Sequence, residues 1–331
     1  MADAPKQVST PRKHHYVWRA NTAKWGNADG QVFFSRNGVV RDAPTNPRNL
    51  MAQRDFYRLP DLSMDALVFV AQLVRQQEDP DLRSPNETIL NLYAQFLVLK
   101  AEVDGSASTP LEERERVERI AIRLHELYFS NLEGTVAPIV DSLRDGSTAV
   151  LRNRENRYRL YLFLGLQLLR TKKLRGQIDR ILRDPSLGGH RFASAEAEGI
   201  AMLCAQIYGQ TIGHSLYLRS DEYRSLVLEN EAEESFITGD QPLLNLLAPE
   251  EGVPQELALY YPLSPRRAFL LLEKKVARRF AAVCSEAVRD LNLCTAAAAH
   301  ETFVGDSAGA IRNIEQARPF RPPDMRRWLV A

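Results

Sequence analysis

The segment Leu160–Leu169 is apolar on every side of a helix except at Gln167, and it constrains the fold more than any other part of the chain. It is half as long as a membrane-spanning helix, which needs about 20 residues. A helix that is apolar all round must be covered by protein, so we predict a core helix surrounded by other elements. Gln167 and the following Arg170 then need partners, because burying unpaired polar groups is costly.

The rest of the pattern places strands toward both ends of the chain and helices between them. We predict an α+β fold, with a mixed or antiparallel sheet built from the N-terminal and C-terminal segments and a central all-helical segment packed against it. The expected organisation is a disordered arm (1–13), a single domain (14–316) and a Pro/Arg-rich tail (317–331). Within the domain we expect strands and loops (14–60), helices (62–215), strands (216–275) and a helix (276–303).

Local signals predict several boundaries. The pair Asn37-Gly38 between two β-rich runs predicts a hairpin turn. Ser63 is a candidate helix N-cap, and Ser84 begins a capping-box pattern with a proline and a glutamate. The helix expected at 111–127 has one apolar face and charges elsewhere, so we expect it to be exposed.

Charge is balanced overall but segregated along the chain. The 43 Lys and Arg residues nearly cancel 42 Asp and Glu residues, which excludes a dedicated nucleic-acid coat or tail. Residues 1–60 hold ten basic and four acidic side chains, residues 144–191 hold twelve and four, and residues 219–256 hold two and ten. The basic blocks could form an anion-binding face and the acidic block a partner-binding face. Alternatively, the blocks neutralise each other across the folded surface.

Several chemistries are disfavoured because their motifs are missing. The sequence has no phosphate-binding glycine loop, no HExxH and no Cys-x-x-Cys. The one GxSxG match, at 305–309, is expected to follow a helix, whereas a nucleophile elbow follows a strand. The three cysteines lack disulfide-framework or metal-finger spacing. With no secretory signal and no apolar run long enough for a membrane segment, we expect a cytoplasmic protein.

Two positions are candidates for catalysis or metal binding. His15, in the pair His14-His15, could be a base or a metal ligand, or simply a solvated residue at the start of a strand. Asp240 lies in the turn Gly239-Asp240-Gln241-Pro242 after an apolar run, where it could bind a metal, orient a histidine, act as a base or stabilise the turn. For each residue, a functional role and a purely structural role remain open.

Three further polar residues need partners inside helices. Gln167 and Arg170 are three apart and share one helix face, so they could hold an anion or form structural pairs. Asn292 follows Leu291 in the last expected helix, where asparagine is mildly disfavoured. Its amide could hydrogen-bond a ligand or a backbone group. His125 is expected at the surface.

Six short motifs are spread along the chain, and their order is informative. They are Lys13-His14-His15-Tyr16-Val17, Asp55-Phe56-Tyr57, Gln167-Leu168-Leu169-Arg170 with Arg175, Phe236-Ile237-Thr238-Gly239-Asp240-Gln241-Pro242, Tyr261-Pro262-Leu263-Ser264-Pro265 and Leu291-Asn292. In this order they resemble the domain-of-unknown-function 4238 family of bacterial proteins, with an N-terminal His-Tyr-Val-Pro motif and a later Ser-Asp-x-Pro motif. The resemblance spans about residues 14–305.

The resemblance implies one domain in which His15, Gln167, Arg170, Asp240 and Asn292 belong to a single polar cluster. It carries no established activity. The chain also departs from the family pattern at two positions, with Trp18 in place of the first motif's proline and Gly239 in place of the serine before the aspartate. The missing serine hydroxyl removes a potential ligand or hydrogen bond beside the aspartate.

One hypothesis is a hydrolase acting on a phosphodiester or nucleotide substrate. The basic blocks would suit an anionic substrate or nucleic acid. A divalent metal, if one is used, would be held by His15 and Asp240. The residues expected to act in catalysis are His15, Asp240 and Asn292, and those expected to bind substrate are Tyr16, Tyr57, Gln167, Arg170 and Arg175.

The alternative hypothesis is a non-catalytic binding or interaction subunit of a bacterial defence or regulatory assembly. Its protein partner would bind through residues 219–256 or through the 111–127 helix. Geometry distinguishes the two hypotheses. An enzyme requires the three catalytic candidates to converge on one open cavity, whereas a binding protein can have these groups scattered or satisfied in the core.

Overall fold

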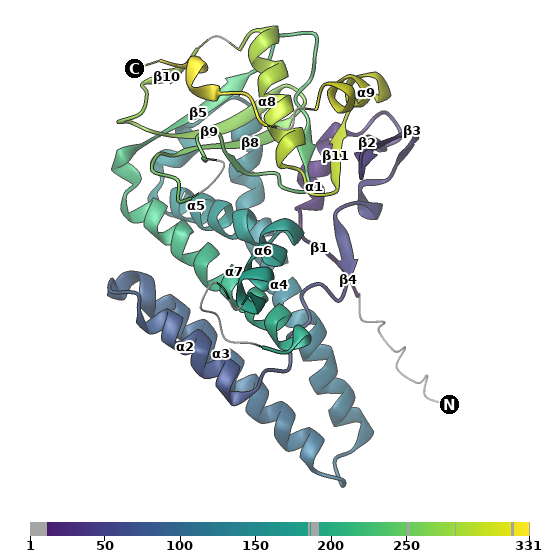
Figure 1. The fold of residues 1–331 in the computed structure, drawn as a ribbon, viewed down its shortest axis with the longest axis vertical. Coiled ribbons are helices and arrows are strands. Elements are labelled where there is room, and N and C mark those ends of the chain that lie inside the picture. The colour runs from purple at the N-terminus through teal and green to yellow at the C-terminus, as the bar shows by residue number, and fades with distance from the viewer. Residues whose placement is uncertain are drawn as a thin grey trace.

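Two four-stranded sheets lie at one end of the molecule, and a long helical hairpin extends from the other end (Figure 1). This computed structural model describes residues 12–184, 186, 192–249, 252–281, 283–318 and 321–330. Most of the predicted N-terminal arm therefore lies outside the described residues. Arg12 and Lys13 do not belong to an arm, because Lys13 begins a strand and Arg12 pairs with Asp55. None of the described helices is long and apolar enough to cross a membrane.

The helices fill the middle of the chain and recur near its end. The α-helices are α1 Arg19–Thr22, α2 Met64–Arg75, α3 Pro80–Gly105, α4 Leu111–Arg144, α5 Arg154–Leu169, α6 Lys172–Arg183, α7 Ser194–Leu218, α8 Ser285–Ala298 and α9 Ala308–Ala317. Short 3-10 helices lie at Ala23–Trp25, Pro47–Asn49, Ala149–Arg152, Ser220–Glu222 and Met325–Trp328. Helices α2 to α7 confirm the helical character expected for the centre of the chain.

The strands pair antiparallel and come from both ends of the chain. They are β1 Lys13–His15, β2 Val32–Arg36, β3 Val39–Thr45, β4 Ala52–Arg54, β5 Tyr223–Glu229, β6 Thr238–Gly239, β7 Leu244–Asn245, β8 Ala258–Ser264, β9 Arg267–Glu273, β10 Arg279–Phe280, β11 Thr302–Gly305 and β12 Leu329–Val330. One sheet has the order β3-β2-β11-β6 and the other β5-β9-β8-β7, while β1 pairs β4 and β10 pairs β12. The first sheet joins N-terminal and C-terminal strands, which confirms the predicted α+β fold.

Local chemistry explains where several elements begin and turn. Asn37 and Gly38 have φ values of 51° and 77°, which is the left-handed backbone that the β2–β3 hairpin turn requires. The Ser63 side chain accepts a hydrogen bond from the Ala66 N–H, so it caps α2 as predicted. The predicted start at Ser84 is wrong, because Asp79 caps α3 and the helix runs through Pro85.

The core helix predicted from the apolar run is α5, and it crosses α7 very closely. A Cβ built on Gly165 would lie 2.3 Å from the Gly209 carbonyl oxygen and 2.5 Å from the Gly213 nitrogen. Only glycines permit this approach of two backbones. Helix α5 ends at Leu169, and α6 begins after Thr171, whose side chain accepts from the Leu174 N–H. The helix turn between α5 and α6 thus positions Arg170 and Arg175 on different elements.

Two expectations for the C-terminal part are wrong. The helix expected at 276–303 is confined to α8, because the backbone is extended at Cys284 and leaves the helix again at Ala299. The apolar residues Phe303 and Val304, which follow α8, belong to β11 and pair with β2 and β6 in the first sheet. The described part of the expected tail, residues 321–330, is also folded, since Met325 is fully buried and β12 pairs with β10. The GxSxG match therefore follows a strand, yet its Ser307 hydroxyl accepts from the Ala310 N–H and caps α9.

Candidate functional site

The two adjacent histidines of β1 have different environments. His14 is fully buried, and its Nδ1 accepts a 2.9 Å hydrogen bond from the Tyr57 N–H. The proton of the neutral ring is therefore assigned to Nε2, which lies 3.4 Å from a Glu126 carboxylate oxygen. His15 is half-buried, its Nε2 lies 3.3 Å from the Arg48 carbonyl oxygen, and burial lowers its pKa to about 4. The His14 ring contacts the motif residue Tyr57, whereas the His15 ring faces the Arg48 carbonyl.

Two tyrosines expected to bind substrate are buried beside these histidines. The Tyr57 hydroxyl donates to the His15 carbonyl at 3.2 Å, and its ring stacks on His14 with centroids 5.8 Å apart. Burial raises the pKa of Tyr57 to about 12 and raises that of Tyr16 as well. Tyr16 packs against Phe56 with ring centroids 5.1 Å apart. These tyrosines remain neutral and support the position of the segment that carries Phe56.

Gln167 and Arg170 form a buried network, as their spacing on one helix face predicts. The Arg170 guanidinium donates to the Gln167 side-chain oxygen and, at 2.6 Å, to Glu133 of α4. It also lies 4.8 Å from the centre of the Phe129 ring. The Gln167 amide donates to the Tyr16 carbonyl at 3.2 Å. Arg170 therefore has a carboxylate partner inside the protein.

The Asp240 carboxylate accepts three hydrogen bonds from consecutive backbone N–H groups. These come from His300, Glu301 and Thr302 at 2.7, 2.7 and 2.9 Å. Burial raises the pKa of Asp240, while the three N–H donors act in the opposite direction. The side chain thereby fixes the turn that leads from α8 into β11.

Asn292 likewise bonds to nearby backbone. Its carbonyl oxygen accepts from the Ile237 N–H at 3.0 Å, and its amide donates to the Ser235 carbonyl and to the Glu234 carboxylate, both at 2.8 Å. Asn292 therefore ties α8 to the irregular segment that leads into β6. Together with Asp240, it holds one corner of the first sheet.

A cleft of about 300 Å³ opens beside β4, and Gln53 of this strand is one of its lining residues. The segment from β4 to α2, helix α6 and helix α7 each form one wall of it. Its lining residues are Gln53, Asp55, Phe56, Arg58, Pro60, Lys172, Arg175, Gly176, Asp179, Ala195, Glu198, Gly199, Ala201 and Met202. Of the residues predicted to form a site, only Arg175 lines this cleft.

Arg175 is held rigidly at the cleft wall but is not neutralised. Its Nη1 donates to the Phe56 carbonyl at 2.7 Å, and its guanidinium carbon lies 4.1 Å from the centre of the Phe56 ring. Burial lowers the pKa of Arg175 to about 10. Among the described residues, no carboxylate lies within 4 Å of its guanidinium. A half-buried, oriented guanidinium without a counterion is suited to binding an anion.

Backbone strain occurs at both ends of the cleft-wall strand β4. Met51 and Asp55, which flank this strand, have φ values of 51° and 55°. Side chains other than glycine are disfavoured in this left-handed region, at a cost of about 1–2 kcal/mol per residue. Such strain is concentrated at functional sites, so its presence beside the cleft is consistent with a binding role.

The residues predicted to form one site therefore lie in different parts of the fold. Tyr16, Tyr57, Gln167 and Arg170 form one buried region, whereas Asp240 and Asn292 bond to separate stretches of backbone. Within the part of the chain that the structure describes, no group of three or more His, Cys, Asp or Glu residues is arranged to hold a metal ion.

Sequence reasoning missed most of the cleft. Lys172 and Asp179 share one face of α6 with Arg175 at helical spacing, a signal that could have been used. Arg58 and Glu198, in contrast, come from separate segments that no spacing pattern connects. His125 was expected at the surface but is buried in α4, where burial lowers its pKa to about 4. Its charged neighbours in the sequence hide the fact that it lies on the inward face of α4.

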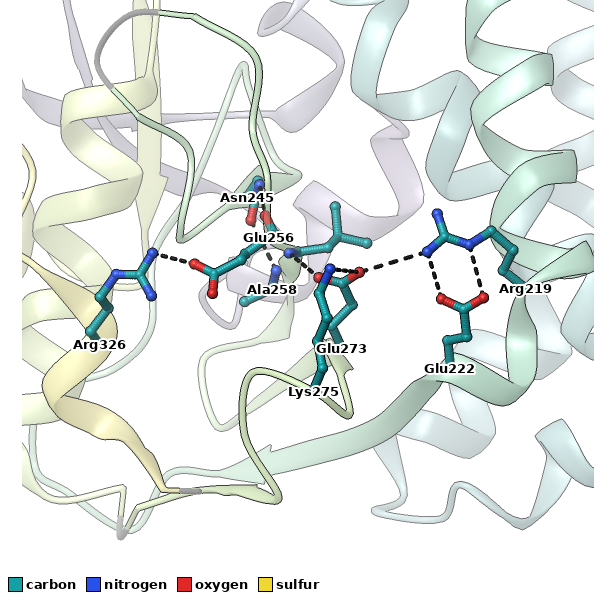
Figure 2. Close-up of polar contacts among 9 residues, drawn as sticks. Arg219, Glu222, Asn245, Glu256, Ala258, Glu273, Lys275 and Arg326 are labelled. Atoms are coloured by element: carbon teal, nitrogen blue, oxygen red, sulfur yellow. Dashed lines mark hydrogen bonds and ion pairs between the residues drawn. The ribbon is translucent and has the colours of Figure 1, made fainter.

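The acidic block is partly neutralised within the chain. Figure 2 shows Glu222 bonded to Arg219 and Glu256 bonded to Arg326. The same view contains the buried Glu273, which accepts a 3.0 Å hydrogen bond from the Leu257 N–H. The basic partners are Arg219, inside the acidic block itself, and Arg326, near the C-terminus, so these acids are neutralised locally and not by the basic blocks 1–60 and 144–191.

The family model for "Protein of unknown function (DUF4238)" matches residues 13–308. This chain belongs to that family. The match runs from β1 through β11 to the start of α9, so the family region includes the cleft and both sheets. Comparison with curated proteins and with solved structures returned no significant match.

Proposed function

We propose that this member of the family is a non-catalytic binding protein that holds a small ligand with an anionic group in the cleft between β4, α6 and α7. The observation that carries the proposal is Arg175, a half-buried guanidinium at the cleft wall with no carboxylate partner among the described residues. A ligand carboxylate or phosphate would supply the missing counterion through charge-assisted hydrogen bonds. Because Phe56 already orients the guanidinium, little side-chain entropy is lost on binding.

The same contacts support binding over hydrolysis. A hydrolase built from His15, Asp240 and Asn292 requires these side chains to face one cavity. Instead, each of them bonds to a different stretch of backbone, and none lines the cleft. A phosphodiester would also meet Asp179 and Glu198 in the cleft, which oppose a polyanion. The proposal therefore includes no catalytic step and no metal.

A thermal-shift screen of small carboxylates, inorganic phosphate, nucleotides and free amino acids tests this proposal. Binding at a hundred times Kd stabilises the folded state by about 2.7 kcal/mol, which corresponds to a rise in Tm of about 5 °C for a chain of this size. We expect a ligand that stabilises the wild-type protein and the matched control Arg180→Gln, an exposed position on α6, but not Arg175→Gln. Equal shifts in all three proteins, or no shift with any of these anions, would overturn the proposal.

A second function, as an interaction subunit, is supported by exposed leucines on α4. Leu124 and Leu127, three residues apart on one face of this helix, are exposed where a protein partner was expected. Apolar side chains gathered on one helix face are typical of partner surfaces. The double variant Leu124→Glu/Leu127→Glu should no longer form a stable complex with the protein partner. The control variant Leu218→Glu should still form it. Unchanged complex formation by the double variant would refute this second function.

A further inference from the structure

The cleft carries equal numbers of positive and negative side chains. Three cationic and three anionic residues line it. The cations are Arg58, Lys172 and Arg175, and the anions are Asp55, Asp179 and Glu198. Which charges remain for a ligand depends on which of these groups already have partners within the protein.

Half of these charges are neutralised by residues outside the cleft. The three groups concerned each have a partner of opposite charge, and Asp55 has a second one in the neighbouring Arg54. The pairs are Arg58 with Glu118, Asp55 with Arg12, and Lys172 with Glu301. In each of these ion pairs the two charges offset each other, so the pairs contribute little net charge to the cleft.

The remaining carboxylates share a single cation. Arg183 of α6 lies 2.7 Å from Asp179 and 3.8 Å from Glu198. The shorter pair neutralises Asp179, whereas the Glu198 side chain is 69% exposed and only loosely paired. One negative charge, located mainly on Glu198, therefore remains on the α7 wall.

Arg175 supplies the matching positive charge on the α6 wall. In the described part of the chain, Glu198 forms no ion pair with the Arg175 guanidinium, so the charged atoms of the two side chains are more than 4 Å apart. They are nevertheless close enough for Glu198 and Asp179 to oppose the lowering of the Arg175 pKa by burial. Helices α6 and α7 pack side by side (Figure 1), so the two unmatched charges lie on neighbouring helices that border the same cleft.

We infer that the ligand is a small zwitterion of the α-amino acid type, whose carboxylate binds Arg175 and whose ammonium group binds Glu198. This inference rests on the proposed function, and it names the ligand class of the same cleft. The cleft volume of about 300 Å³ is at the small end of ligand sites. A ligand with both charges matches both walls, whereas a simple anion leaves Glu198 without a partner and a dianion is repelled by it.

The first test screens the standard L-amino acids one by one by thermal shift and measures the best binder by calorimetry. Two derivatives of that amino acid each remove one charge. The N-acetyl derivative lacks the ammonium group, and the amide lacks the carboxylate. We expect each derivative to bind at least tenfold more weakly than the free amino acid, because each leaves one cleft charge unmatched.

Two variants assign the charges to their residues. Glu198→Gln should weaken the free amino acid about tenfold and bring it within about threefold of its N-acetyl derivative. Arg175→Gln should abolish binding of both. Glu102→Gln, an exposed position on α3, is the matched control and should bind like the wild-type protein. Glu198 is exposed, so its substitution should leave folding intact, which unchanged circular dichroism would verify.

The outcomes separate this inference from the proposed function. If acetate or the N-acetyl derivative binds as tightly as the free amino acid and Arg175→Gln abolishes that binding, the zwitterion is wrong and anion binding stands. If amino acids bind equally well to Arg175→Gln, both are wrong. If no amino acid stabilises the protein while another anion does, the zwitterion is again refuted.

Discussion

Removing the Asp240 carboxylate should unfold the protein far more readily than removing a comparable acid elsewhere. Asp240→Ala leaves the N–H groups of His300, Glu301 and Thr302 without their acceptor. A hydrogen bond to a charged group contributes about 1.5–3 kcal/mol, and desolvation of the carboxylate offsets part of the sum. We therefore expect a loss of about 3–5 kcal/mol in the free energy of unfolding.

Urea unfolding followed by circular dichroism measures this loss. Asp306→Ala is the control, because Asp306 accepts one side-chain bond from Ser235, and its loss should cost only about 1.5 kcal/mol. Hydrogen exchange should also show faster exchange of β11 amides in Asp240→Ala. A variant as stable as the Asp306 control would refute the structural role and restore Asp240 as a candidate for catalysis.

Two further predictions concern helix packing and pH. Gly165→Ala should destabilise the protein by at least about 3 kcal/mol in urea unfolding, because its Cβ would overlap Gly209. Gly134→Ala, with open space around it, should stabilise by about 0.5–1 kcal/mol; equal effects would contradict the close crossing. The pKa of His125 falls from 6.5 to about 4 on folding, so its contribution is complete above pH 6.5 and is lost as the pH falls toward 4. At pH 5 the free energy of unfolding should be about 2 kcal/mol lower on account of His125. His125→Gln should abolish this pH-dependent loss, and a urea midpoint that depends on pH in the variant as it does in the wild type would refute the prediction.

Local patterns predict much of the fold because they act within a few residues. The Asn37-Gly38 turn, the Ser63 cap and the apolar run of α5 each depend on contacts inside one element. The end of α8 was not predicted because the alanine-rich run continues a helical pattern past Ala299. There, the pairing of β11 with β2 and β6 overrides the local preference.

The site was predictable only in part, for a related reason. Gln167 and Arg170 meet because a helix places residues three apart on one face. Arg175 and Glu198 come together only through the packing of α6 on α7, which no sequence spacing reveals. His14 and His15 are adjacent and chemically identical, and only the partner Tyr57 determines which ring is buried.

The most direct test of the central claim follows the Arg175 guanidinium itself. Its Nε–Hε resonance in ¹H–¹⁵N NMR spectra can be assigned by its loss in Arg175→Gln and monitored while acetate is added. The account predicts a saturable shift of this resonance, while the exposed Arg180 shows only the small linear drift of a solvated side chain. An Arg175 resonance that moves no more than that of Arg180 would contradict anion binding in the cleft.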